Sequence, residues 1–151
     1  MPRLECASPR DVQRSRVYAW ENAYVAPHDQ TNIAFSDAQG IVDAIWADMR
    51  LRYPPKVEPL SPRNTGVLAQ ATRLALYLPQ RTPSWCILHE LAHCMSMTHD
   101  GHSDGHGPVF MGLYVQLLER YMRLPCASLN DALATAAIRV EREARPVFLD
   151  G

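Results

Sequence analysis

Residues 89–93 read His-Glu-Leu-Ala-His, and this pattern constrains the chain more than any other feature. Two residues four positions apart on an α-helix differ by only about 40° in direction and roughly 6 Å along the axis. The imidazoles of His89 and His93 can therefore bind one metal ion, and Glu90 projects beside them, where a water molecule on that ion would lie. Zinc prefers such nitrogen ligands and lowers the pKa of its water, so Glu90 is predicted to be the catalytic base.

The neighbouring sequence supports a metal site over two incidental histidines. Apolar residues alternate with others along residues 72–78, which predicts a strand. A helix is predicted from Pro83-Ser84 to about Met97, and a loop rich in histidine, residues 99–107, follows it. A strand before an HExxH helix is the arrangement that peptidases use to hold an extended substrate, so we interpret residues 72–78 in that way.

A catalytic zinc site needs a third protein ligand and one open position. His106 is the best candidate, because it begins the next predicted helix and the twelve residues after His93 let the chain reverse. A continuing helix would instead carry His99 about 9 Å further along its axis, out of reach. His99, His102 and Asp104 are predicted to belong to the loop that lines the site, as solvated residues. The alternative, first for His102 and Asp104, is a transition-state donor or a hydrogen-bonded partner of the ligands.

Other polar residues near the motif are interpreted mainly as packing residues. Cys86 lies one turn before His89 and can in principle touch the metal, but a small buried thiol is the simpler reading for it and for Cys94. The hydroxyls of Tyr77 and Tyr114 are further candidates for stabilising an oxyanion. Packing is again the preferred interpretation of both.

Composition and charge argue against several other classes of protein. The formal net charge is −1, whereas nucleic-acid-binding domains usually have a strong basic excess. The N-terminal residues lack the apolar segment of a signal peptide, and no apolar run is long enough to cross a bilayer. We therefore expect a cytoplasmic protein whose four cysteines, which form no CxxC motif, are free thiols: Cys6, Cys86, Cys94 and Cys126.

The remaining pattern predicts a single α+β domain over residues 1–151, long enough for one core. Further helices are predicted at about 9–24, 37–52, 108–122 and 128–143, with Ser36 and Ser128 as N-terminal caps. Short strands are predicted at 56–60 and 66–70. The predicted fold is a small antiparallel or mixed sheet of about three strands, packed with about five helices.

The metal motif resembles that of the SprT-like domain, the catalytic part of Spartan-type proteases of DNA–protein crosslinks. The resemblance consists of His89–His93, the twelve-residue gap and His106-Gly-x-x-Phe110, within roughly residues 85–122. It implies that His89, His93 and His106 bind one zinc ion and that Glu90 is the base. It also implies a zincin-like fold with HExxH on the active-site helix.

More of the chain resembles a small actinobacterial family of metallohydrolases that also occurs in phages. The shared features are the order strand, HExxH and HGPxF, the overall length, and the N-terminal pattern Pro9-Arg10-Asp11-x-Gln13-Arg14-x-x-Val17-Tyr18-x-x-Glu21. This resemblance implies a minimal gluzincin-like peptidase domain.

These observations predict a zinc metallopeptidase, or more broadly a metallohydrolase, acting on a peptide or protein as a monomer or weak oligomer. One alternative is a non-catalytic, zinc-stabilised binding or regulatory domain, in which a fourth ligand comes from His99, His102, Asp104 or Cys86. The other is a SprT-like, DNA-associated protease, which the near-neutral charge does not favour.

Overall fold

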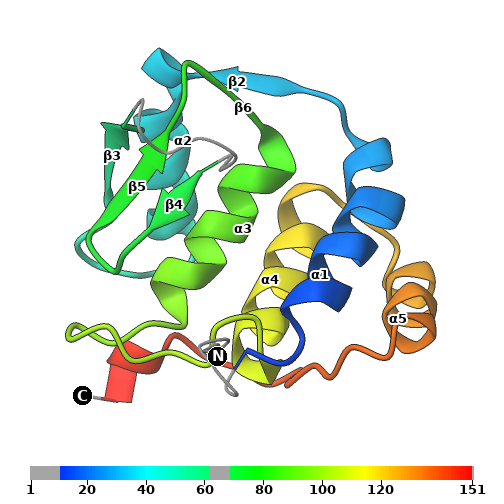
Figure 1. Cartoon of the computed structure of the whole chain (residues 1–151). Coiled ribbons are helices and arrows are strands. Elements are labelled where there is room, and N and C mark those ends of the chain that lie inside the picture. The colour runs from blue at the N-terminus through cyan, green and yellow to red at the C-terminus, as the bar shows by residue number, and fades with distance from the viewer. Residues whose placement is uncertain (1–10, 62–68, 151) are drawn as a thin grey trace, which may run out of the picture.

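The computed structural model of the protein describes residues 11–61 and 69–150 (Figure 1). As predicted, the fold is α+β, and the described residues contain five α-helices. These are α1 (Arg14–Trp20), α2 (Phe35–Asp48), α3 (Ser84–Met95), α4 (Pro108–Tyr121) and α5 (Cys126–Thr135). A π-helical turn, Glu21–Val25, and a 3-10 turn, Ala26–His28, continue α1, and a further 3-10 turn covers Val147–Asp150.

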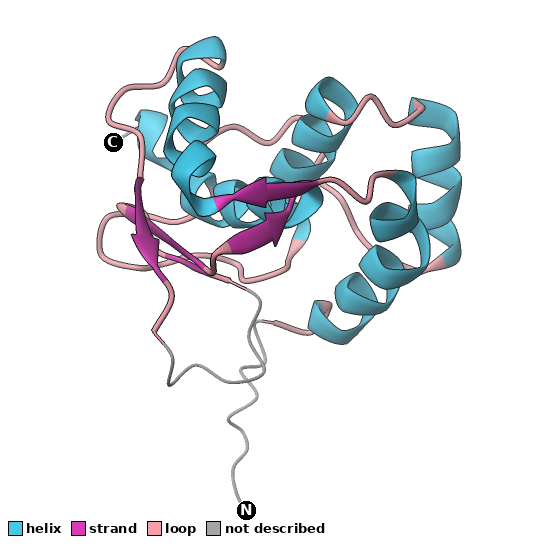
Figure 2. Cartoon of the chain, turned by 90° about the horizontal axis from the view of Figure 1, so that it is seen from above, coloured by secondary structure: helices cyan, strands magenta, loops and turns pink. Residues whose placement is uncertain are grey.

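Two small sheets lie beside the helices (Figure 2). The first is mixed, with the order β3 (Lys56–Pro59), β5 (Ala75–Leu78), β4 (Gln70–Ala71). Strand β3 runs parallel to β5, and β4 runs antiparallel to it. The second sheet pairs β2 (Asn32–Ala34) with β6 (Arg81–Pro83), antiparallel. The prediction of a mixed sheet of about three strands is confirmed, and the two-stranded sheet was not predicted.

The strand predicted at residues 72–78 is shorter and has a different role from the one inferred. Thr72 forms a turn in which its hydroxyl accepts hydrogen bonds from the backbone N–H groups of Leu74 and Ala75, so the strand begins only at Ala75. Strand β5 is central in its sheet, with β3 on one side and β4 on the other. Its backbone is therefore already paired, and the prediction that it holds an extended substrate is wrong.

Two predicted helix caps are also wrong. Ser36 lies inside α2, because the chain passes from β2 into the helix without a loop, and the N-cap is Ala34. Ser128 lies inside α5, which begins directly after Pro125. The fixed φ angle of proline suits a position at the start of a helix, so Pro125 is a better indicator of the start of α5 than Ser128.

Three helices have different ends from those predicted. Arg50 and Ala137 have φ angles of 62° and 58°, which right-handed helices do not contain, so α2 ends at Asp48 and α5 at Thr135. The regular part of the first helix begins at Arg14, and its predicted start at Pro9 lies outside the described residues. Most of the strand predicted at 66–70 lies outside them as well, and β4 follows at Gln70–Ala71.

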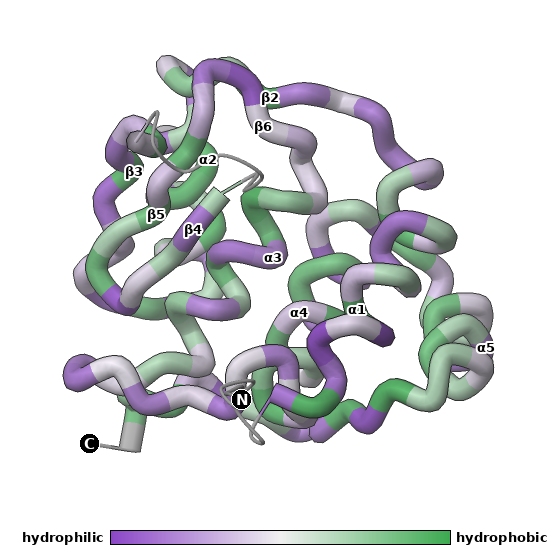
Figure 3. Tube along the Cα trace, viewed as in Figure 1, coloured by the Kyte–Doolittle hydropathy of each residue, from purple (hydrophilic) through white to green (hydrophobic). Residues whose placement is uncertain are grey.

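Helix α3 occupies the centre of the molecule, packed against α4 and against both sheets. All its residues except Ser84 and His93 are buried. Figure 3 shows α3 as a mainly hydrophobic helix with polar interruptions. The polar residues of this helix include His89, Glu90 and His93 of the HExxH motif. Polar groups buried in the core need hydrogen-bond or metal partners there, so these residues of α3 are candidates for a functional site.

The described cysteines are free thiols, as predicted: Cys86 and Cys94 are buried and Cys126 is exposed. The Cys94 thiol donates to the carbonyl of Thr72, 2.9 Å away, and burial raises the pKa of both buried thiols. Cys6 lies outside the described residues. No helix in the described ranges has the length and apolar character needed to cross a bilayer.

Candidate metal centre

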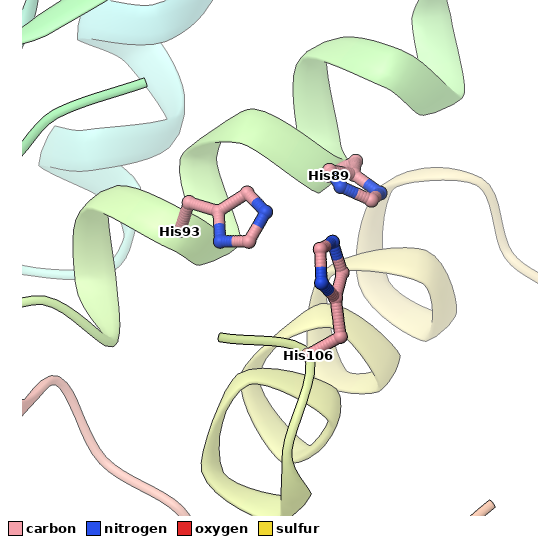
Figure 4. Close-up of side chains that lie close together, drawn as sticks. All are labelled: His89, His93 and His106. Atoms are coloured by element: carbon pink, nitrogen blue, oxygen red, sulfur yellow. The ribbon is translucent and has the colours of Figure 1, made fainter. Parts of the chain in front are cut away.

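Three histidine rings converge between α3 and the start of α4 (Figure 4). His89 and His93 come from successive turns of α3, and His106 comes from the segment just before α4. The candidate ligand nitrogens of the three all lie within 4.8 Å of one another. Among the described residues, no other group of histidine, cysteine, aspartate or glutamate side chains converges in this way. The group can hold a metal ion.

A buried carboxylate holds the ring of His89. The Oε2 atom of Glu21 lies 2.5 Å from His89 Nδ1 and also accepts a hydrogen bond from the hydroxyl of Tyr114, at 2.7 Å. Glu21 is only 3% exposed and lies in the π-helical turn after α1, a feature that often marks functional sites. Because Nδ1 is engaged by Glu21, Nε2 of His89 is the nitrogen left for a metal.

His106 is held in a comparable way by Asp11 and Gln13. Asp11 accepts from the backbone N–H of His106 at 2.9 Å and lies 3.1 Å from its Nδ1, while the Gln13 amide donates to the His106 carbonyl at 3.0 Å. Nε2 of His106 is buried and has no hydrogen-bond partner. A buried nitrogen without a hydrogen-bond partner, close to two other imidazoles, is suited to bind a cation, so the residues present fit a metal ion.

The electrostatics of the cluster disfavour protonation of its centre. Burial and the neighbouring charges of His89 and His106 hold the pKa of His93 well below its ordinary value. Burial also lowers the pKa of His106, although Asp11 opposes this. Burial acts to lower the pKa of His89 too, but the hydrogen bond and charge of Glu21 outweigh it and raise that pKa. Neutral rings are the form that binds metal.

Glu90 is buried beside the cluster. It is 7% exposed, and burial, together with the charge of Glu21, raises its pKa to about 7, although His89 acts in the opposite direction. A carboxylate with this pKa can take up and release a proton near neutral pH, as a general base requires. A cation in the histidine cluster would favour its ionised form.

Aromatic rings border the cluster on two sides. Phe110 is fully buried and stacks on His93, with ring centroids 4.3 Å apart. Tyr18, on α1, lies edge-on to His106 at 5.0 Å and is partly exposed. The cluster is therefore bordered by an apolar ring on its buried side, and its side at Tyr18 is more accessible to solvent.

The loop residues considered as alternative ligands make other contacts or are exposed to solvent. Asp104 accepts hydrogen bonds from the backbone N–H groups of Val109 and Phe110, at 2.7 and 3.2 Å, and so caps α4. His102 is exposed and pairs with Asp100 at 3.2 Å, and His99 is exposed. The group that can hold a metal does not include these residues or Cys86.

The two tyrosines considered as oxyanion donors do not have suitable surroundings. Tyr114 is fully buried, and its hydroxyl is committed to Glu21. Tyr77 lies in the central strand of the mixed sheet, in register with Gln70 and Glu58. Tyr114 is therefore a residue that positions Glu21.

Asp104→Ala is expected to lower the free energy of unfolding by about 1 kcal/mol, because two N–H groups in the first turn of α4 lose their acceptor. The matched control is Asp100→Ala in the same loop, where the carboxylate is exposed, and its effect should stay within about 0.5 kcal/mol. Urea unfolding of the metal-free proteins measures both. Equal effects of the two substitutions would show that Asp104 is not a cap.

Sequence reasoning missed the residues that hold the ligands. Asp11, Gln13 and Glu21 precede the motif by about seventy residues or more, and they were noted only as part of a resembling N-terminal pattern. A usable signal existed, because Asp11, Arg14, Tyr18 and Glu21 are spaced to lie along one side of a helix. Histidine ligands almost always need such hydrogen-bond partners.

Glu21→Gln is expected to weaken zinc binding about 10- to 100-fold, because the uncharged amide is a poorer acceptor for the His89 ring. The glutamine carbonyl can still accept from Tyr114, so the fold should be retained. Competition with a chromophoric chelator measures the affinity. Asp131→Asn, which removes an exposed charge on α5, is the control and should leave the affinity unchanged. Equal affinities in all three proteins would remove Glu21 from the site.

The fold and the cluster together define an α+β protein with a three-histidine site that can hold a metal ion. Comparison of the chain with known protein families, with curated proteins and with solved structures finds no match.

Proposed function

We propose that this chain is a zinc-dependent metallohydrolase, and specifically a metallopeptidase of the HExxH type. The observation that carries the proposal is the convergence of His89, His93 and His106 next to the buried carboxylate of Glu90. Three imidazoles with a carboxylate beside them form a donor set and a base, which is what metal-assisted hydrolysis needs.

Zinc is the ion that best suits these ligands. Zinc commonly binds imidazole nitrogen in a tetrahedral site, and in catalytic sites it has three protein ligands with one position open. The carboxylates of Glu21 and Asp11, which contact the Nδ1 atoms of His89 and His106, match the carboxylate–histidine pairs of zinc sites.

A catalytic role is favoured over a closed, structural zinc site. A structural site has four protein ligands, and among the described residues only three side chains converge. The side chains considered for the fourth position do not join the cluster. Asp104, for example, accepts a hydrogen bond in the first turn of α4. The fourth position is therefore available to solvent or substrate.

A zinc ion held by His89, His93 and His106 would supply Lewis acidity for the substrate carbonyl and for the attacking water. Glu90 accepts a proton from the attacking water and then donates it to the leaving nitrogen as the C–N bond breaks. Glu21 and Asp11 keep the imidazoles oriented throughout. Phe110 excludes water from the buried side of the cluster.

The proposal is tested with full-length protein loaded with one equivalent of zinc. The protein is incubated with unfolded casein and with a mixed peptide library, and new amino termini are detected by mass spectrometry. Cleavage that stops on chelation and returns on adding zinc supports a peptidase. Tight binding of one zinc ion without any cleavage of either substrate would instead favour the non-catalytic domain.

A further inference from the structure

Tyr18 is the aromatic residue that lies where the histidine cluster meets solvent. Its ring centroid is 5.0 Å from that of His106 and 6.2 Å from that of His89. The side chain is 39% exposed, whereas each of these two histidines is 5% exposed. Tyr18 lies on α1, and its ring stacks on that of His89 in α3, the helix that also carries Glu90.

Tyr18 contacts the histidine rings but is not part of the buried core. The buried face of α1 is formed by Val17 and Trp20, and Tyr18 lies beside that face, not within it. Its hydroxyl makes no hydrogen bond within the part of the chain that the structure describes. By contrast, the hydroxyls of Tyr24, Tyr114 and Tyr121 donate to Ser128, Glu21 and Asp48.

One cationic side chain lies beside the Tyr18 ring. The guanidinium carbon of Arg14, one turn earlier on α1, lies 5.6 Å from the centroid of the Tyr18 ring. Phe110 closes the opposite, buried side of the cluster by stacking on His93. Tyr18, with Arg14 beside it, therefore lies on the more exposed side of the cluster.

We propose that Tyr18 is a catalytic residue whose hydroxyl donates a hydrogen bond to the oxyanion formed during peptide hydrolysis. This inference rests on the proposed function. When the water oxygen bonds to the carbonyl carbon, the C=O π pair moves onto oxygen, and the Tyr18 O–H stabilises that charge without giving up its proton. The proton from water passes to Glu90 and then to the leaving amine, so Tyr18 ends each cycle unchanged.

The test compares the full-length wild type with Tyr18→Phe, which keeps the ring and removes the hydroxyl. Both proteins are loaded with Co²⁺ in place of zinc and titrated with acetohydroxamic acid, followed by visible absorption. Tyr18→Phe should bind the hydroxamate 10- to 100-fold more weakly, the loss typical of a hydrogen bond to a charged group. In the zinc form, kcat should fall about 100- to 1000-fold with little change in KM. Tyr24→Phe is the matched control, since its hydroxyl contacts Ser128, and it should behave as the wild type.

The possible results separate this inference from the proposed function. Equal hydroxamate binding by wild type and Tyr18→Phe overturns the role of Tyr18 and leaves the peptidase proposal intact. A change in the Co²⁺ spectrum of Tyr18→Phe before hydroxamate is added would make Tyr18 a metal ligand, which also overturns the donor role. If the wild type binds cobalt but no hydroxamate, the site has no open position, and both proposals fail.

Discussion

Glu90→Gln is expected to abolish hydrolysis while the protein keeps its fold and its metal. Glutamine is nearly the same size as glutamate but cannot accept a proton from water. Because a positioned general base typically contributes about 100- to 10,000-fold, kcat should fall by at least about 100-fold. The measurement is kcat of the zinc-loaded variant, together with its metal content and near-ultraviolet circular dichroism.

The control for this substitution is Glu143→Gln, an exposed glutamate in the C-terminal segment, which should keep full activity. The HExxH position of Glu90 and its burial beside His89 distinguish the two glutamates. If Glu90→Gln retains activity within about threefold of the wild type, Glu90 is not the base. Loss of zinc from this variant would assign Glu90 to the ligands instead.

Removal of the metal is expected to destabilise the protein strongly. A metal that binds only the folded state stabilises it by about 4 kcal/mol when its free concentration is 1000 times the dissociation constant. For a chain of this length, that corresponds to roughly 10 °C in Tm. The physical reason is that the ion ties α3 to the start of α4, and without it Nε2 of His106 is left buried and unpaired.

Thermal unfolding at a series of buffered free zinc concentrations measures this effect. The Tm of the wild type should rise with free zinc, whereas that of His93→Ala should not. His102→Ala replaces an exposed loop histidine and should behave as the wild type. A wild-type Tm that is independent of zinc would contradict a site in the folded protein, and loss of the zinc effect in His102→Ala would place the site in the loop.

The clustering of His89, His93 and His106 could be predicted from the sequence because its geometry is largely local. Four residues of helix place His89 and His93 on one face, and the next helix brings His106 back to them. The same local rules predicted the α+β class and most of α3 and α4. They failed where the backbone departs from regular structure, as at Arg50 and Ala137, whose positive φ angles end helices without a glycine.

The partners of the ligands could not be predicted, because they depend on long-range packing. Glu21 reaches His89 across 68 positions of sequence, and Asp11 reaches His106 across 95. The spacing of Asp11 and Glu21 fits one side of a helix, but it does not show which element that side will face. The pairing order of the strands is similarly non-local, so the sequence does not show that β5 lies between β3 and β4.

The most direct test of the account is the coordination sphere of the zinc-loaded protein. Crystals should give an anomalous difference peak at the zinc absorption edge between α3 and the start of α4. The account predicts Nε2 atoms of His89, His93 and His106 at about 2.0–2.1 Å, with solvent in the remaining position. A zinc ion enclosed by four protein ligands, or bound away from these rings, would contradict it.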